Sequence, residues 1–408
     1  MLALASGCAV QEGTDHAGNA QPLPRDLVMM PHDTAALEGV RTHVEMNAPA
    51  SAVCTPKATP SVVPMGWREM DFTGQEWAYG ARVGHSAVWD GREMLVFGGG
   101  TPETASYDPN QDRWTKLPAS GLAARAHQLA TWTGHEMIVV GGSSKDGVAF
   151  DDGARFDPCA STWKPIARAT SAIPDGATAV WATTTHEMIV VGNGVALAYR
   201  ADVDAWRTLA ASPLGKGAKP IATWIGESMI VYAGGAAASY DPARDVWSSL
   251  PSAPSTAPRG EVAIATGNGA TFFGGPTDKT TFDGTYTGYF AMNGVTYDAL
   301  RSAWANVPAP AADVLSERSH AMTFWGNGKL FVWGGHVINA DRYIHTAEDG
   351  ATFDPTTGAW TKLPRATVYA MREDASVVWT GTEAIFLGGV SSCTMGNPTP
   401  FGGEVFRP

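Results

Sequence analysis

The chain has 408 residues, of which 46 are glycine and only 17% are charged, and its formal net charge at pH 7 is −12. This acidic balance argues against nucleic acid or an anionic membrane surface as the main partner. No window approaches the roughly 18 apolar residues of a membrane-spanning helix. The composition instead favours many short buried strands joined by tight turns.

The first eight residues, MLALASGC, end in a cysteine that follows a glycine. They resemble the end of a bacterial lipoprotein signal, provided that the natural start lies upstream; an ordinary apolar N-terminus with a chance cysteine is the alternative. The resemblance implies lipidation of Cys8 and an extracytoplasmic protein, either secreted or held at a bacterial cell envelope. The membrane would then be contacted only through that anchor.

Residues 9–64 contain seven prolines, separated by Gly, Ala and Thr without sustained periodicity. Such a composition is typical of an extended tether. We therefore expect two parts in the chain, a segment 1–64 with the signal remnant and the tether, and a single domain at 65–408.

Within 65–408, seven apolar runs each end in a double glycine or a close variant. The runs end at Gly99, Gly142, Gly194, Gly235, Gly275, Gly335 and Gly389. In the first repeat, a turn at Asp90-Gly91 precedes the run, and Tyr107-Asp108-Pro109 later turns the chain into a segment with Trp114. This order predicts four strands, beginning with a tight hairpin. Seven such repeats predict an all-β, seven-bladed β-propeller with four-stranded blades.

The seventh repeat lacks its tryptophan. It ends at Val405-Phe406-Arg407-Pro408, which matches Ser106-Tyr107-Asp108-Pro109 of the first repeat. The missing residue is found near the start of the domain, where Gly66-Trp67-Arg68 matches Arg113-Trp114-Thr115. We therefore expect an N-terminal strand to close the last blade, because it would pair an otherwise open sheet edge.

These repeats resemble the kelch family, whose members carry a double glycine after the second strand and a spaced Tyr and Trp later. The resemblance covers residues 65–408 and implies a kelch-type propeller. Repeat three departs from the pattern, with Gly192-Asn193-Gly194 and no Asp-Pro, and repeat five lacks the proline after Asp298. The blades are therefore not expected to be equivalent.

Five of the predicted first strands begin with arginine. In a propeller, the connections into the first strand and between the second and third strands lie on one face, which we call the loop face; the hairpins and Asp-Pro turns lie on the opposite hairpin face. The five residues on the loop face are Arg82, Arg125, Arg259, Arg318 and Arg372. Because guanidinium forks bind carboxylates bidentately, such a ring predicts an anion receptor. The alternative is a structural role, in which the side chains bond neighbouring blades.

Irregular stretches on the loop face supply further candidates for ligand binding. They are Trp77 and Tyr79 before the first blade, an insertion at 276–294 in the fifth, and His336, Arg342, Tyr343 and His345 in the sixth. Long loops on a rigid scaffold often carry recognition. Ordinary packing, or an insertion without a partner, is the alternative.

Besides Cys8, the chain has Cys54, Cys159 and Cys393. A disulfide between Cys54 and Cys393 is favoured, since both belong to the region where the ends of the domain meet. Three reduced thiols are the alternative.

No zinc-protease motif, phosphate-binding glycine loop, calcium loop or nucleophile elbow is present, and no metal or other cofactor is predicted. The leading hypothesis is a monomeric binding module that presents its loop face to a protein or a glycan. The alternative is a sugar-active enzyme that resembles the sialic-acid mutarotases, which are also kelch propellers. Glu317 or Glu373 with His320 would then act as general acid and base, while Arg318 and Arg372 would hold a carboxylate.

Overall fold

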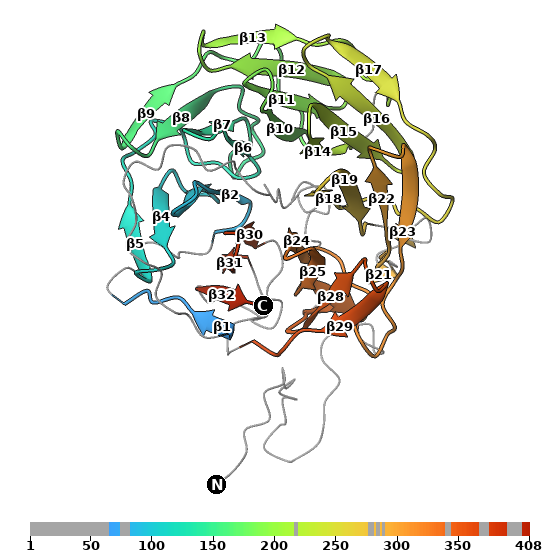
Figure 1. Cartoon of the computed structure of the whole chain (residues 1–408). Coiled ribbons are helices and arrows are strands. Elements are labelled where there is room, and N and C mark those ends of the chain that lie inside the picture. The colour runs from blue at the N-terminus through green and yellow to red at the C-terminus, as the bar shows by residue number, and fades with distance from the viewer. Residues whose placement is uncertain are drawn as a thin grey trace, which may run out of the picture. The chain divides into compact units, whose positions relative to one another are not determined.

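A computed structural model describes residues 65–73, 82–215, 219–275, 281–282, 286–287, 290–338, 344–366, 375–389 and 402–408. Within these ranges all regular elements are β-strands. The same residues include no helix that could cross a membrane. Seven four-stranded sheets lie radially around a central axis (Figure 1). The predicted all-β, seven-bladed propeller with four-stranded blades is thus confirmed.

The first four blades follow the chain without interruption, and each is an antiparallel sheet in sequence order. Blade 1 consists of β2 (His85–Trp89), β3 (Met94–Gly98), β4 (Thr104–Asp108) and β5 (Arg113–Lys116). Blade 2 consists of β6 (Leu129–Trp132), β7 (Met137–Val140), β8 (Gly153–Asp157) and β9 (Thr162–Pro165). Blade 3 consists of β10 (Thr178–Ala182), β11 (Glu187–Gly192), β12 (Val195–Arg200) and β13 (Ala205–Thr208). Blade 4 consists of β14 (Ile221–Ile225), β15 (Ser228–Ala233), β16 (Ala236–Asp241) and β17 (Val246–Ser249).

Blades 5 and 6 each carry an extra two-stranded sheet between their second and third strands. Blade 5 consists of β18 (Val262–Thr266), β19 (Gly269–Phe273), β22 (Gly294–Asp298) and β23 (Ala303–Val307), with β20 (Thr281–Phe282) and β21 (Tyr286–Thr287) inserted. Blade 6 consists of β24 (Met322–Gly326), β25 (Lys329–Trp333), β28 (Gly350–Asp354) and β29 (Ala359–Lys362), with β26 (His336–Ile338) and β27 (Ile344–Thr346) inserted. Blade 7 consists of β30 (Ser376–Trp379), β31 (Ala384–Leu387), β32 (Gly403–Arg407) and β1 (Gly66–Glu69).

The N-terminal strand β1 closes the ring as predicted. It pairs antiparallel with β32, with Trp67 opposite Phe406. The Trp67 ring also lies 4.2 Å from that of Trp333, centroid to centroid, so Trp333 is a packing residue although it stands outside the repeat pattern. The indole N–H of Trp67 donates to the Pro364 carbonyl at 2.9 Å. Strand pairing, ring packing and a hydrogen bond therefore join the two ends of the domain.

This hydrogen bond of Trp67 belongs to a series that links neighbouring blades. In the series, the fourth-strand tryptophan of one blade donates to the carbonyl found four residues after the fourth-strand tryptophan of the preceding blade. The other members are Trp206 to Ala167, Trp247 to Ala210, Trp304 to Pro251 and Trp360 to Pro308, at 2.7–2.8 Å. Trp67 therefore has the same structural role in blade 7 that these residues have in theirs.

The double glycines are required by the backbone. Gly142 and Gly335 have φ angles of 82° and 88°, which favour glycine. A Cβ at Gly142 would lie 2.6 Å from the Ala126 carbonyl oxygen, and one at Gly335 would lie 2.4 Å from that of Ser319. The second strand thus ends in a turn that passes directly against the start of the first strand, where no side chain fits.

The hydrophobic core lies between the blades. In one cluster, Met94 and Val96 of blade 1 pack with Ile385 and Leu387 of blade 7, and all four are almost completely buried. Because the second strands are covered by neighbouring sheets on both faces, they consist mainly of apolar residues, which explains why they stand out in the sequence.

Candidate functional site on the loop face

The loop face differs from the hairpin face in the lengths of its connections. On the hairpin face, the turn between the third and fourth strands has four residues in each of blades 1 to 6. On the loop face, the second and third strands are joined by only two residues in blades 3 and 4 (193–194 and 234–235), but by 274–293 in blade 5, 334–349 in blade 6 and 388–402 in blade 7. Blade 1 has a connection of five residues (99–103) and blade 2 one of twelve (141–152). The three longest connections therefore lie on the consecutive blades 5, 6 and 7.

Three of the predicted ring arginines are buried in the blades. Arg82, Arg125 and Arg318 are only 1–2% exposed. Each directs its Nη1 at the carbonyl that ends the second strand of its own blade: Gly98 at 2.9 Å, Gly141 at 3.1 Å and Gly334 at 3.1 Å, respectively. Arginine is therefore repeated here because it satisfies carbonyl groups that the double-glycine turn leaves without strand partners.

Aspartates on the loop face pair with two of these arginines. Nη1 of Arg125 lies 2.8 Å from Asp152, and Nη1 of Arg318 lies 2.8 Å from Asp349. Burial lowers the pKa of Arg318, and the charge of Asp349 opposes that effect. The guanidinium of Arg125 also lies 4.2 Å from the centre of the Phe150 ring. Nη1 of each arginine is used within its own blade, so the geometry favours the structural alternative over the anion receptor for Arg82, Arg125 and Arg318.

A backbone hydrogen bond explains why these positions recur at the blade junctions. The carbonyl of the arginine at the start of one blade accepts an N–H from the double-glycine turn of the preceding blade. The three pairs are Gly389 to Arg82, Gly100 to Arg125 and Gly234 to Arg259, at 3.0–3.2 Å. The Arg259 side chain is exposed, so it differs from its three buried counterparts.

The histidines near the arginines also connect blades. Nε2 of His85 lies 2.6 Å from the Ser376 hydroxyl of blade 7. His127 has a φ of 58°, and its backbone N–H donates to the Gly84 carbonyl at 2.7 Å. Burial lowers the pKa of His127, while Asp175 opposes the shift. Both residues therefore hold the junctions around blade 1.

A half-buried cluster at the junction of blades 5 and 6 is the best candidate for ligand contact. An isolated β-bridge pairs Ser319 with His336. This bridge brings the rings of His320 and His336 to 5.8 Å, nearly perpendicular to each other. Glu261 of blade 5 accepts the His320 N–H at 2.8 Å. We call His320, His336, Glu261 and Ser319 the His-Glu cluster; it lies at the bases of the two longest connections.

The His-Glu cluster offers hydrogen bonds and exchangeable protons. Imidazole and carboxylate groups can donate to or accept from sugar hydroxyls or polar peptide groups. In the described part of the chain, no group of three or more His, Cys, Asp or Glu side chains could hold a metal ion. Glu317, the predicted acid or base, is exposed.

Several predicted site residues lie outside the described residues. They are Arg372, Glu373, Trp77, Tyr79, Arg342, Tyr343, Cys8, Cys54 and Cys393. Of His345, only the backbone is described, opposite Val337 in the β26–β27 hairpin. Cys159 is in a disulfide bond, and its partner also lies outside the described residues. The predicted bond between Cys54 and Cys393 therefore stays a prediction.

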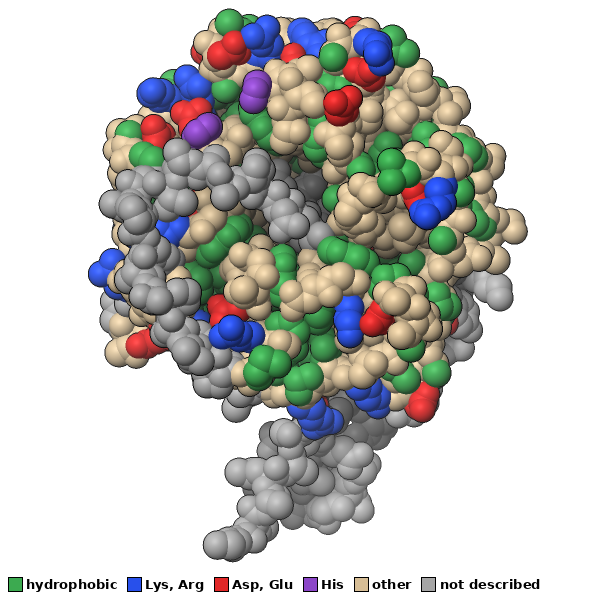
Figure 2. Space-filling view, in the orientation of Figure 1, with side chains coloured by type: hydrophobic (Ala, Val, Ile, Leu, Met, Phe, Trp, Pro, Cys, Tyr) green, Lys and Arg blue, Asp and Glu red, His purple; other side chains and the backbone are tan. Residues whose placement is uncertain are grey.

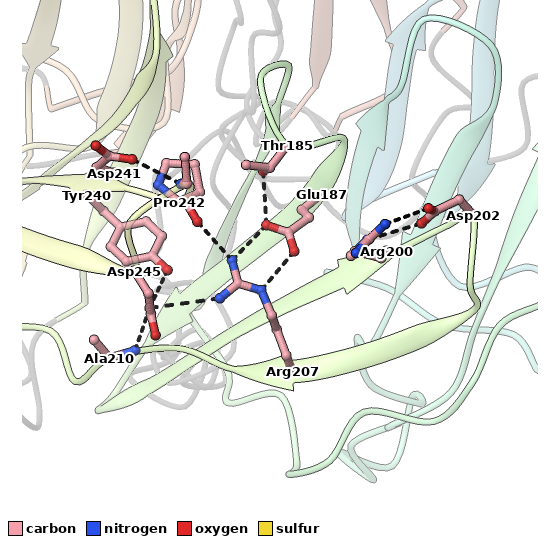
Figure 3. A network of polar contacts seen from close by, with 11 residues as sticks. Thr185, Glu187, Arg200, Asp202, Arg207, Ala210, Tyr240, Asp241, Pro242 and Asp245 are labelled. Atoms are coloured by element: carbon pink, nitrogen blue, oxygen red, sulfur yellow. Dashed lines mark hydrogen bonds and ion pairs between the residues drawn. The ribbon is translucent and has the colours of Figure 1, made fainter.

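The hairpin face contains ion pairs that sequence reasoning missed. The carboxylate of Glu187, only 3% exposed, accepts hydrogen bonds from Nε and Nη2 of Arg207, both at 2.8 Å (Figure 3). Nη2 also donates to the Pro242 carbonyl of blade 4, and Nη1 lies 3.9 Å from Asp245. The hydrogen bonds that Arg207 donates to Glu187 raise the pKa of Arg207. Arg207 is therefore a charged link between two blades.

Two other junctions have an equivalent link. Arg155 of blade 2 lies 3.3 Å from Glu136 and donates to the Ala201 carbonyl of blade 3. Arg68 of blade 7 contacts Tyr107, Asp112 and the Pro109 carbonyl of blade 1. We call Arg68, Arg155 and Arg207 the arginine clamps. The tripeptide His-Glu-Met occurs in both blade 2 and blade 3, and its glutamates, Glu136 and Glu187, bind two of the clamps. This repetition is the feature of the sequence from which these ion pairs could have been predicted.

The chain matches no known protein-family profile and no curated protein sequence. Its function is therefore inferred from its own geometry.

Proposed function

We propose that this chain is a kelch-type propeller that binds a glycan or protein ligand through its loop face. The unequal connections on that face carry the proposal. Six third-to-fourth strand turns on the hairpin face have the same length, whereas blades 5 to 7 carry connections many times longer than those of blades 3 and 4. A scaffold whose long connections lie on one face is typical of proteins that build a recognition surface there.

The His-Glu cluster supports this site, since its polar side chains lie half-buried at the base of the long connections. Rings and carboxylates held in place by backbone contacts lose little freedom on binding, which favours affinity. The sugar-active enzyme gains no comparable support. Its carboxylate-holding Arg318 is buried and paired with Asp349.

We also propose an extracytoplasmic protein, acting as a monomer. The disulfide bond of Cys159 supports this location, because disulfides persist mainly in oxidising compartments. Lipidation of Cys8 would tether such a protein to the envelope. On the face shown in Figure 2, acidic and basic side chains lie next to one another around the ring, and neither sign forms one large patch. This arrangement supports a partner other than nucleic acid.

Replacing the loops tests the function. In one variant, residues 276–291 are removed, so that the blade 5 connection is closed by the four residues 274, 275, 292 and 293 and the buried Met292 is kept. In the matched control, the hairpin-face turn 299–302 is replaced by the four residues 242–245. Both proteins and the wild type are applied to a glycan array and cross-linked to intact bacterial envelopes.

We expect the wild type and the control to bind the same ligand and the loop variant to lose it while keeping its melting temperature. Equal binding by the loop variant would move the site away from this connection. An absence of wild-type binding in both formats would contradict the proposal, and turnover of an acidic sugar would favour the enzyme.

A further inference from the structure

Six of the seven junctions between blades are filled on the hairpin face by a large apolar residue of the second strand. Three of these six, the junctions of blades 7 and 1, 2 and 3, and 3 and 4, also carry an arginine clamp. The apolar residues are almost completely buried at all six junctions; they are Leu95, Ile138, Ile189, Ile230, Phe331 and Ile385.

The junction of blades 5 and 6 has neither filling. Strand pairing places Thr271 in the register of Leu95, Ile230 and Phe331. Thr296 stands in the register of the clamp residue Arg155, and Ala305, which follows Trp304, stands in that of Arg207. A shorter side chain therefore occupies each position that fills another junction.

Blade 6, on the other side of this junction, lacks the tyrosine and aspartate that several other blades carry at the same positions. In blades 1, 3 and 4 a third-strand tyrosine bonds an aspartate five residues later, and in blades 1 and 4 a clamp contacts this pair. In blade 6 the corresponding residues are Phe353 and Gly358. In blade 5, the first strand also has Ala265 where the other six blades have tryptophan.

A cavity of about 230 Å³ lies where these groups are missing. Its apolar wall is formed mainly by Trp325, Leu330 and Phe353 of blade 6, with Val307 and Pro355. Its opposite wall carries the hydroxyl-bearing Thr266, Thr271 and Thr296 of blade 5. None of these residues is charged, and Lys329 and Asp354, which pair at 3.4 Å, are adjacent to lining residues in sequence.

We propose that this cavity is a second binding site, for a small neutral molecule with one apolar ring and one hydroxyl group, of the phenol type. Size favours a single ring: an apolar cavity of about 150 Å³ holds benzene, and drug-sized ligands need about 300 Å³ or more. The faces of Trp325 and Phe353 suit an aromatic ring, and a threonine hydroxyl suits a single polar substituent.

The small number of hydroxyl groups in the cavity argues against a monosaccharide as the ligand. Two of the three hydroxyls, those of Thr271 and Thr296, already bond each other at 2.8 Å. A sugar would bury several hydroxyl groups against an apolar wall without partners, which is unfavourable. The site is also separate from the loop-face function, since Thr266 and Pro355 lie at the hairpin-face ends of their strands.

Residues of blade 4 provide variants that fill the cavity. Thr271→Ile and Thr266→Ile introduce the residues found at the same registers in blade 4, Ile230 and Ile225. Thr115→Ile makes the same chemical change on an exposed position of blade 1 and is the control. Binding of phenol, and of glucose as the sugar probe, is measured by ligand-observed NMR titration of the full chain, and folding is checked by melting temperature.

A ring of this size can reach about millimolar to micromolar affinity. We expect the wild type and Thr115→Ile to bind phenol equally, and Thr271→Ile and Thr266→Ile to bind it at least about tenfold more weakly without a lower melting temperature. If Thr271→Ile does not fold, Thr266→Ile decides alone. Equal binding by all variants, no phenol binding by the wild type, or binding of glucose in preference to phenol would each overturn the proposal.

Discussion

A buried arginine in this propeller acts as a backbone partner. Nη1 of Arg318 donates to the carbonyls of Gly334 and Asp349, both at 3.1 Å, while Nε reaches the Ser316 carbonyl. One side chain thus holds both sides of a connection on the loop face. Since Arg82 and Arg125 bond the corresponding carbonyls, the role belongs to the position and is independent of any ligand.

Removal of one such arginine should be costly. Arg318→Ala leaves buried carbonyl groups without donors, and we expect a loss of about 3 kcal/mol in the free energy of unfolding, the upper end for buried groups left unsatisfied. Arg113→Ala, on an exposed position of β5, should change stability by less than about 0.5 kcal/mol. Urea titration checks both values, and an Arg318→Ala protein as stable as the control would return the guanidinium to the candidates for ligand binding.

His127 makes stability depend on pH. Burial lowers its pKa from the ordinary 6.5, so the unfolded chain takes up a proton at a higher pH than the folded protein. Neutral His127 therefore contributes stability that is fully present above about pH 6.5 and is lost as the pH falls through the lowered folded pKa. His127→Asn, which tolerates a φ of 58°, should flatten the decline between pH 7 and pH 5 in urea titrations. Parallel pH profiles for the two proteins would assign the decline to other groups.

At the scale of elements, the arginine clamps show how one side chain can bond two neighbouring sheets. Arg207 on β13 binds the buried Glu187 of its own blade and the turn of blade 4 (Figure 3). Arg200 and Asp202 form a second pair in the same view, but on the surface. The two pairs differ in that Glu187 is buried. We expect the buried pair to have the larger interaction energy, because solvent screens the exposed pair.

A double-mutant cycle measures this difference. With Glu187→Gln and Arg207→Gln, we expect a coupling energy of about 1–3 kcal/mol, as is found for residues of one buried network. The matched cycle with Arg200→Gln and Asp202→Asn should give a coupling close to zero, since both groups are exposed. Equal couplings in the two cycles would show that Arg207 contributes only as a surface residue.

The sequence predicts blade number and closure because those features depend on local backbone requirements. Two residues illustrate this. Gly142 is required because the backbone there has a positive φ and passes beside a carbonyl, and Trp67 is recognised because it completes a regular series of tryptophans. The arginine clamps and the cavity are harder to predict from the sequence. Arg68 and Arg207 directly follow a fourth-strand tryptophan, but Arg155 comes from a third strand, so no single spacing marks all three arginine clamps. The cavity at Thr271 arises from side chains that are missing, which no motif marks.

At the scale of the whole molecule, ring closure depends on a strand of four residues. Strand β1 supplies the edge of blade 7, the tryptophan bond to Pro364 and the clamp Arg68, which lies 2.8 Å from Asp112 of blade 1. It therefore joins blade 7 to both neighbours, blade 6 through Pro364 and blade 1 through Asp112. An open ring would lose all three contacts together.

Truncation tests this dependence. Removal of residues 1–70 deletes β1 and leaves β32 as an unpaired edge, so we expect aggregation or a large fall in melting temperature. Removal of residues 1–50 keeps β1 and should have little effect. Trp67→Ala in the full chain keeps the strand but removes its ring and its bond to Pro364, and should cost about 3–5 kcal/mol. Melting curves and size-exclusion chromatography of the three proteins check this order. Equal melting temperatures for the two truncations would show that the ring holds without β1, because the six remaining junctions would then suffice to keep the first and last blades together.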